Sequence, residues 1–204
     1  MAKVKLTKNE LKRQKDNLRR FTRYLPTLEL KKKQLLVEIA KIQTEIERVE
    51  SDMEKTDRQV ADWADVFAED VALDEMISVS EIKTSHGNIA GIEIPIFEDV
   101  VFEESEVDLF STPVWVDSGL EAVREQMKRR AFLQVAKKQQ DIIREELRVT
   151  IQRIKLFEEV KIPEARENIR VIQIFLADQQ TAEVVRGKIA KAKIEKKKQE
   201  SALP

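Results

Sequence analysis

The sequence predicts a mainly α fold, a long antiparallel two-helix coiled coil with a small insert that contains a β-hairpin. Apolar residues recur in alternating steps of three and four from Leu11 to Phe67, which is the narrow seam of a coiled coil. Charged residues make up 37% of the chain and aromatic residues 5%, as in long exposed helices. The repeat stops in mid-chain and a second helical pattern follows. We therefore expect an N-terminal helix over 1–73, an acidic insert over 74–117 and a C-terminal helix over 118–204.

The first helix has a start signal and a predicted kink. Thr7 stands three residues before Glu10, the spacing of a capping box that satisfies free amide groups at a helix start. Pro26 lies inside the pattern and removes one backbone donor, so we expect the kink there. The seam runs on to Trp63 and Phe67, and its predicted contact residues in this helix are Leu18, Leu25, Leu35, Ile39, Ile42, Ile46, Val49 and Met53.

The insert changes the pattern to short β-branched runs. We expect strands over 77–84 and 91–97, joined by a turn over 85–88, where His86 is a surface turn residue. A proline cannot donate to a sheet, so the second strand is predicted to be an edge or to end early, with an irregular return over 98–116. The residues that define the hairpin are Ile82, Gly87, Gly91, Ile94 and Pro95.

The second helix is predicted to begin with a capping box at Ser118 and Glu121 and to run to about Lys198. Its seam shows two phases that meet near Pro163, which predicts a kink or local unwinding at that point. The helix should fold back antiparallel to the first, so that both termini meet at one end. Its predicted seam contacts are Ile154, Phe157, Ile169, Ile172 and Leu176.

Charge is unevenly distributed along the chain. Residues 1–33 carry twelve basic residues against three acids, residues 50–121 carry three against twenty, and residues 122–204 carry twenty against twelve. The basic ends and the acidic middle are expected to meet different partners. Few aromatic residues accompany the basic ones, so we expect no nucleic acid among these partners.

The sequence offers no set of residues for catalysis. It has no Cys, a single His and no glycine-rich phosphate loop, and its acidic clusters lack the spacing of a calcium loop. We therefore expect a non-catalytic protein without metal or cofactor. Neither a membrane span nor a signal peptide is recognisable, so we expect a cytoplasmic protein without direct membrane insertion.

Three segments resemble the D subunit of the V-type and A-type rotary ATPases. They are VKLTKNEL at 4–11, GIEIP at 91–95 and LFEEVKIP at 156–163, the last followed by Glu167, Asn168 and Ile169. None is a catalytic signature, and the resemblance depends on their order and spacing over nearly the whole chain. It implies a central-stalk rotor subunit that transmits torque between the catalytic hexamer and the membrane ion-translocating ring, and so couples ATP hydrolysis or synthesis to proton or sodium transport.

The resemblance also implies partners. These are the catalytic and nucleotide-binding subunits of the hexamer, the F subunit of the stalk and the subunit that joins the shaft to the membrane ring, which makes the protein peripheral to the membrane. The residues expected at the hexamer end are Lys8, Lys12, Arg13, Arg19, Arg20, Arg186, Lys188 and Lys191. Two alternatives stay open at this point, a prefoldin-like coiled-coil chaperone and a stalk protein of an export apparatus.

Overall fold

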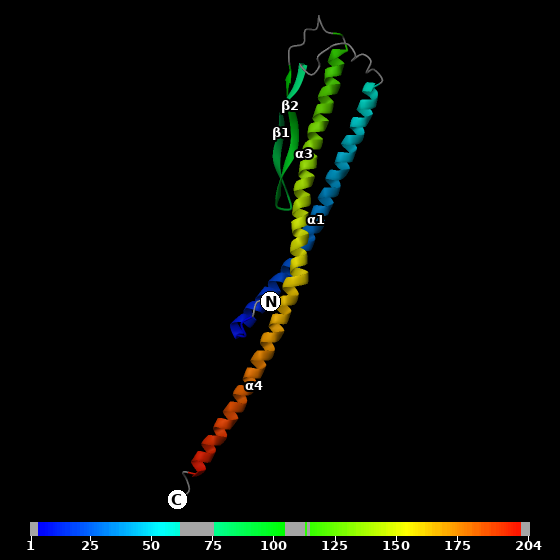
Figure 1. Cartoon of the computed structure of the whole chain (residues 1–204). Helices are drawn as coiled ribbons and strands as arrows, with labels where there is room; N and C mark the ends of the chain where they lie inside the picture. Colours follow the sequence, from blue (N-terminus) through cyan, green and yellow to red (C-terminus); the bar gives the residue numbers. More distant parts are fainter. Residues whose placement is uncertain (1–3, 62–75, 105–112, 114, 201–204) are drawn as a thin grey trace. The chain divides into compact units, whose positions relative to one another are not determined.

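A computed structural model describes residues 4–61, 76–104, 113 and 115–200. Helix α1 (Lys8–Ala61) is followed by strands β1 (Ile77–Ile89) and β2 (Ile92–Glu104), helix α3 (Val116–Lys155), the π-helix η2 (Leu156–Lys161) and helix α4 (Ile162–Glu200) (Figure 1). This order of helix, hairpin and helix confirms the predicted fold class. The described residues form two compact units: one spans Leu30–Thr150, and the other is built from the chain up to Glu29 and from Ile151 onward.

Two of the predicted helix boundaries can be compared with the structure. The amide of Glu10 donates to Thr7 Oγ1 at 3.2 Å, so Thr7 caps α1 as expected. The other half of the capping box does not form, because the Thr7 amide donates to the Lys5 carbonyl and the Glu10 carboxylate accepts from Gln14. Helix α3 begins two residues before Ser118, and its first backbone bond runs from the Val116 amide to the Pro113 carbonyl. Residues 62–75, and with them the boundary at 73 and the seam positions Trp63 and Phe67, lie outside the described residues.

In the unit that spans Leu30–Thr150, α1 and α3 run antiparallel. Polar contacts between them pair rising numbers on one helix with falling numbers on the other: Lys31 with Glu146 at 2.7 Å, Gln43 with Gln140 at 2.8 Å, Glu50 with Lys137 at 3.0 Å, Thr56 with Arg129 at 2.6 Å and Asp57 with Gln126 at 3.0 Å. The ion pairs among these contacts are partly or fully exposed and contribute little to stability by themselves. They show the register in which the two helices meet.

The core of this unit lies along the seam. Leu35, Ile42 and Ile46 of α1 pack in one cluster with buried residues of α3 and β2, namely Leu133, Ala136, Ile143 and Ile94. Ile39, Val49 and Met53 lie partly buried against it. Burying an aliphatic side chain of this size contributes about 1.5–3 kcal/mol, so this cluster is the main source of the unit's stability.

The hairpin turn ends at Gly91, three residues after the end of the predicted turn over 85–88. Strand β1 continues through Ser85, His86, Gly87 and Asn88, and the turn is formed by Ala90 and Gly91, with φ of 52° and 81°. Two positive φ values in succession indicate a type I′ turn, which matches the twist of paired strands. The Gly91 amide donates to Asn88 Oδ1 at 3.0 Å. The sequence-based prediction assigned residues 85–88 to the turn, whereas the left-handed conformation falls on Ala90 and Gly91, after Ile89.

Strand β2 is also longer than expected. Pro95 pairs with His86 inside the ladder, and the strand continues to Glu104, so of the two predicted alternatives the early end was wrong. The predicted irregular return was wrong over 98–104, and most of its remainder lies outside the described residues. The sheet has two strands, so each strand has a free edge where a proline loses no ladder bond. Irregular pairing between Val79 and Glu81 and between Lys83 and Thr84 shifts the register twice.

The hairpin packs against α3. Phe97 meets Phe132 edge to face with ring centroids 5.8 Å apart, Lys128 pairs with Asp99 at 3.2 Å, and the Gln139 side-chain amide donates to the Pro95 carbonyl. Ile94 is 4% exposed and belongs to the core cluster. The hairpin therefore contributes to the core of its unit.

The other unit contains the π-helix η2. Phe21 of α1 contacts Phe157 with ring centroids 5.1 Å apart, and the Ile162 amide donates to the Phe157 carbonyl five residues earlier, the pattern of a π turn. This confirms the local unwinding predicted near Pro163. Helix α1 continues through Pro26 as one helix, and the predicted kink at that residue stays a prediction.

Replacing Ile46 tests the seam. Ile46 is 3% exposed, so Ile46→Asp places an unpaired charge in the core and should cost about 3–5 kcal/mol of unfolding free energy. Val37→Asp is the matched control, because Val37 lies on the same helix and is 53% exposed. Chemical denaturation should show a large loss for the first variant and little change for the second. Equal effects would mean that Ile46 does not lie in the core.

Replacing Ala90 tests the turn. An alanine with φ of 52° is strained, whereas asparagine adopts this conformation readily. Ala90→Asn should therefore raise the unfolding free energy by about 1 kcal/mol. Gly91→Ala, at φ of 81°, should lower it by a similar amount. A neutral result for both, measured by denaturant midpoints, would contradict the turn type.

Candidate subunit interface

Helix α4 leaves the coiled-coil seam before it ends. Ile162, Ala165 and Ile172 are buried, Leu176 is partly buried, and every residue over 177–197 is exposed. The polar residues Gln179 and Glu183 stand where a 3-4 repeat from Leu176 would need apolar ones. The last part of α4 therefore has no helix packed on it within the described residues.

A second apolar repeat begins shortly before the seam ends and continues along this bare part of α4. We call it the exposed stripe; it consists of Val171, Phe175, Ala182, Val185, Ile189 and Ala192, spaced by three, four or seven residues. Val185 is 49% exposed and Ile189 52%. Single exposed apolar residues are common, but a row of them on one helix face marks a surface that binds another protein.

Basic residues surround the exposed stripe. Arg186, Lys188 and Lys191, which the sequence predicted at the hexamer end, are all exposed on α4, where Lys191 has only a loose ion pair with Glu195 at 3.9 Å. The exposed stripe and the basic residues near it are suited to a partner that offers apolar contacts and acidic side chains.

The other predicted hexamer-end residues lie on α1. Lys8, Lys12, Arg13, Arg19 and Arg20 are all exposed, and Lys12, Arg13 and Arg20 line a shallow surface groove. The two termini do not lie together at one end, so that prediction was wrong. Phe21 contacts Phe157, and from this contact α1 runs only to Lys8 whereas the second helix runs on to Glu200, so α4 is much longer beyond the contact than α1. Whether these residues bind a partner stays a prediction.

The predicted seam and hairpin residues can also be placed. All the seam residues are buried or partly buried: Leu18, Leu25, Leu35, Ile39, Ile42, Ile46, Val49, Met53, Ile154, Phe157, Ile169, Ile172 and Leu176. In the hairpin, Ile82 and Pro95 are half-buried and Gly91 is exposed. Gly87 lies in β1, where a Cβ would collide with the Ile96 side chain. A close approach, rather than a turn, explains this glycine.

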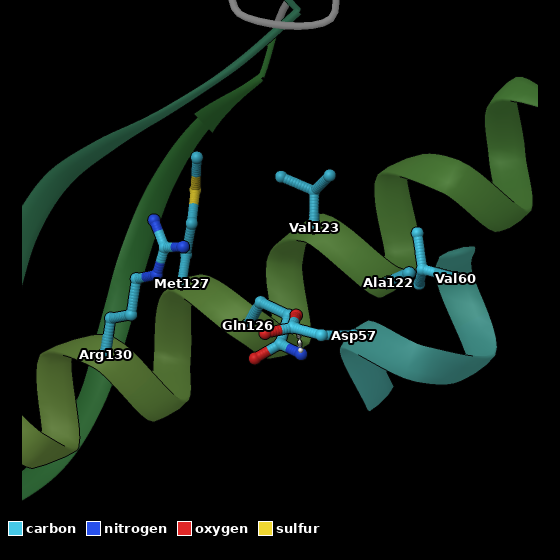
Figure 2. Close-up of a pocket in the computed structure, with 7 residues that line it drawn as sticks. All are labelled: Asp57, Val60, Ala122, Val123, Gln126, Met127 and Arg130. Carbon is cyan, nitrogen blue, oxygen red and sulfur yellow. Dashed lines mark hydrogen bonds between the residues drawn. The ribbon is translucent and has the colours of Figure 1, made fainter. Parts of the chain in front are cut away.

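A cavity of about 240 Å³ lies between the end of α1 and the start of α3. Figure 2 shows Asp57 and Val60 of α1 beside Ala122, Val123, Gln126, Met127 and Arg130 of α3, with Gln126 bonded to Asp57. Its walls are largely apolar. They carry no Cys, His or Ser that could act as a nucleophile, so the cavity does not resemble a catalytic site.

The resolved pKa shifts belong to ion pairs on the surface. Lys55 lowers the pKa of Asp52, Arg148 that of Glu145 and Arg170 that of Glu167, each from the next turn of the same helix. The Val100 amide and then Lys128 lower the pKa of Asp99. These pairs support helices and the hairpin, and none forms the coupled buried set that acid–base catalysis uses.

Two further features, a metal site and a membrane-spanning helix, are absent from the described part of the chain. It holds no group of three or more His, Cys, Asp or Glu side chains placed to bind a metal ion. Among the helices as far as they are described, none has a stretch long and apolar enough to span a lipid bilayer.

The fold and the bare helix end define a class: a coiled-coil protein in which one helix continues beyond the seam with an exposed apolar row. Comparison with known proteins makes this specific. The family described as the ATP synthase D subunit matches residues 10–192, and the chain belongs to that family. It is 45% identical to the V-type ATP synthase D subunit of Borreliella burgdorferi over 98% of this chain and all of that protein. The proteins of the same name from Chlamydia abortus and Chlamydia felis are 33% and 34% identical, each over 98% of both chains.

The sequence-based prediction missed the exposed stripe. It assigned Arg186, Lys188 and Lys191 on this part of the helix to the hexamer end without recognising a second apolar repeat. The signal was present, since the seam ends at Leu176 while apolar residues continue one position out of step. A repeat that ends as another begins on the same helix indicates a change of partner.

Proposed function

We propose that this chain is the central-stalk rotor subunit of a V-type rotary ATPase and transmits torque between the catalytic hexamer and the membrane ion-translocating ring. In this role it couples ATP hydrolysis or synthesis to proton or sodium transport. The observation that carries the proposal is the family match over residues 10–192, together with a relative named as the D subunit that is matched over its full length. The chain itself supplies no chemistry, and its contribution is mechanical.

The paired helices fit a shaft. Torque requires a body that resists bending and twisting, and two helices held along one apolar seam are stiffer than either alone. The cluster around Leu35, Ile42 and Ile143 holds them together on one side, and the hairpin packs on α3 through Phe132. A rotor must also present unequal faces to equivalent subunits, and the exposed stripe gives α4 one such face.

The ends of the shaft have different partners in this proposal. The exposed stripe of α4 and the basic residues beside it, with Lys8, Lys12, Arg13, Arg19 and Arg20 of α1, dock in the hexamer of catalytic and nucleotide-binding subunits. The hairpin end meets the F subunit of the stalk and the subunit that couples the shaft to the membrane ring. The protein then works in the cytoplasm, peripheral to the membrane.

The two alternatives lose their support. A prefoldin-like chaperone or an export stalk protein explains a coiled coil, but neither explains a match to the ATP synthase D subunit along nearly the whole chain.

The two neighbouring valines of α4 provide a sharp test. Val185 lies on the exposed stripe and Val184 lies about 100° away around the helix, while both are exposed, at 49% and 59%. Val185→Asp should weaken binding to the reconstituted hexamer by at least about tenfold, since burying an unpaired charge in an interface costs more than the roughly 1.4 kcal/mol that tenfold requires. Val184→Asp should weaken it much less.

The controls separate binding from folding. Neither substitution should change the thermal unfolding of the free chain, because neither side chain is buried in it. Binding of the F subunit should persist in both variants. Equal losses for the two valines would show that the stripe is not the docking face, and unchanged hexamer binding by both would contradict the proposed placement of α4.

A further inference from the structure

From Ile143 onward, the seam positions of α3 and α4 follow one rule with one exception. Buried or partly buried residues step by three or four at Ile143, Leu147, Thr150, Ile154 and Phe157, and again at Ile162, Ala165, Ile169, Ile172 and Leu176. Between Phe157 and Ile162 the step is five. One residue has been added to the repeat at this point.

The added residue coincides with η2. The π-helix spans Leu156–Lys161, and the Ile162 amide donates to the Phe157 carbonyl across five residues. A π turn takes up one residue more than an α turn, so it absorbs an insertion without unpairing the backbone around it. The helix is thus kept continuous while its apolar repeat changes phase.

The change of phase decides which side of α4 is buried. Extended as an unbroken α-helix from Phe157, the first repeat would direct inward Lys161, Glu164, Asn168, Val171 and Phe175. Lys161 and Asn168 are partly buried, and the other three are exposed, with Val171 at 40% and Phe175 at 42%, whereas Ile172 is fully buried. Rotation by one residue, about 100°, separates the two arrangements.

We propose that η2 is a register joint: the extra residue between Phe157 and Ile162 sets the rotational phase of α4, and so fixes which of its two apolar repeats is buried and which forms the exposed stripe. The proposal concerns the isolated chain and does not depend on the partner. In this proposal the register of the seam causes the π turn. Pro163, which lies directly after the turn and lacks an amide donor, is not its cause.

Pro163→Ala separates the two causes. If the register holds the π turn, the bond from the Ile162 amide to the Phe157 carbonyl persists in this variant, as measured by the NMR coupling across that hydrogen bond. If the Ile162 amide moves to the Glu158 carbonyl, the turn is due to the proline and the proposal fails.

Deleting Glu159 in the Pro163→Ala background restores a step of four. With a step of four there is no additional residue for a π turn to absorb, so the helix should become α throughout. The midpoint of thermal unfolding should rise by at least roughly 2 °C relative to Pro163→Ala alone. Deleting Arg144 in the same background is the matched control. Arg144 is also exposed, but its loss displaces Leu147, Thr150, Ile154 and Phe157 from the seam, so the midpoint should fall. A lower midpoint after deletion of Glu159 would overturn the proposal.

Thiol labelling reads the phase of α4 directly. The chain has no native cysteine, so Val171→Cys and Ile172→Cys can each be introduced alone. Val171→Cys should label at least about tenfold faster than Ile172→Cys in the wild-type, Pro163→Ala and Glu159-deleted backgrounds. A reversed order in either altered background would show that the joint does not set the phase in the way proposed.

Discussion

Contact between the two long helices depends on keeping two apolar repeats in phase over many turns. An α-helix has about 3.6 residues per turn, so a step of three or four returns a side chain to nearly the same face, and a step of five does not. On α1 the repeat reaches Leu35, Ile42 and Ile46 without loss of phase. On α3 and α4 it is kept only because η2 takes up an additional residue.

The other features of the described chain are arranged around this constraint. Gln140, 5% exposed, donates to Gln43 between apolar seam positions, and such a buried polar pair favours one register over its neighbours. The hairpin adds Ile94 to the same cluster and covers α3 through Phe97. Where the repeat of buried residues ends, at Leu176, the helix is bare and its second repeat is free to bind a partner.

The sequence was most informative where the structure is periodic. Coiled-coil periodicity is a property of residue spacing alone, so the seam of α1, the phase change before Pro163 and the helix, hairpin and helix order could all be predicted. The hairpin turn could not, because Ser85–Asn88 and Ala90–Gly91 are both compatible with local turn preferences and strand pairing chose between them. The exposed stripe was missed because its residues follow the same 3-4 rule as the seam, and only burial distinguishes the two.

Hydrogen exchange on the free chain and on the assembled ATPase tests the central claim, that one seam holds the helices while the end of α4 is kept for a partner. In the free chain, amides of Leu35–Ile46 and Leu133–Ile143 should be strongly protected and those over 177–197 should exchange fast. On assembly, 177–197 should gain strong protection. Protection of 177–197 in the free chain, or no gain on assembly, would contradict the account.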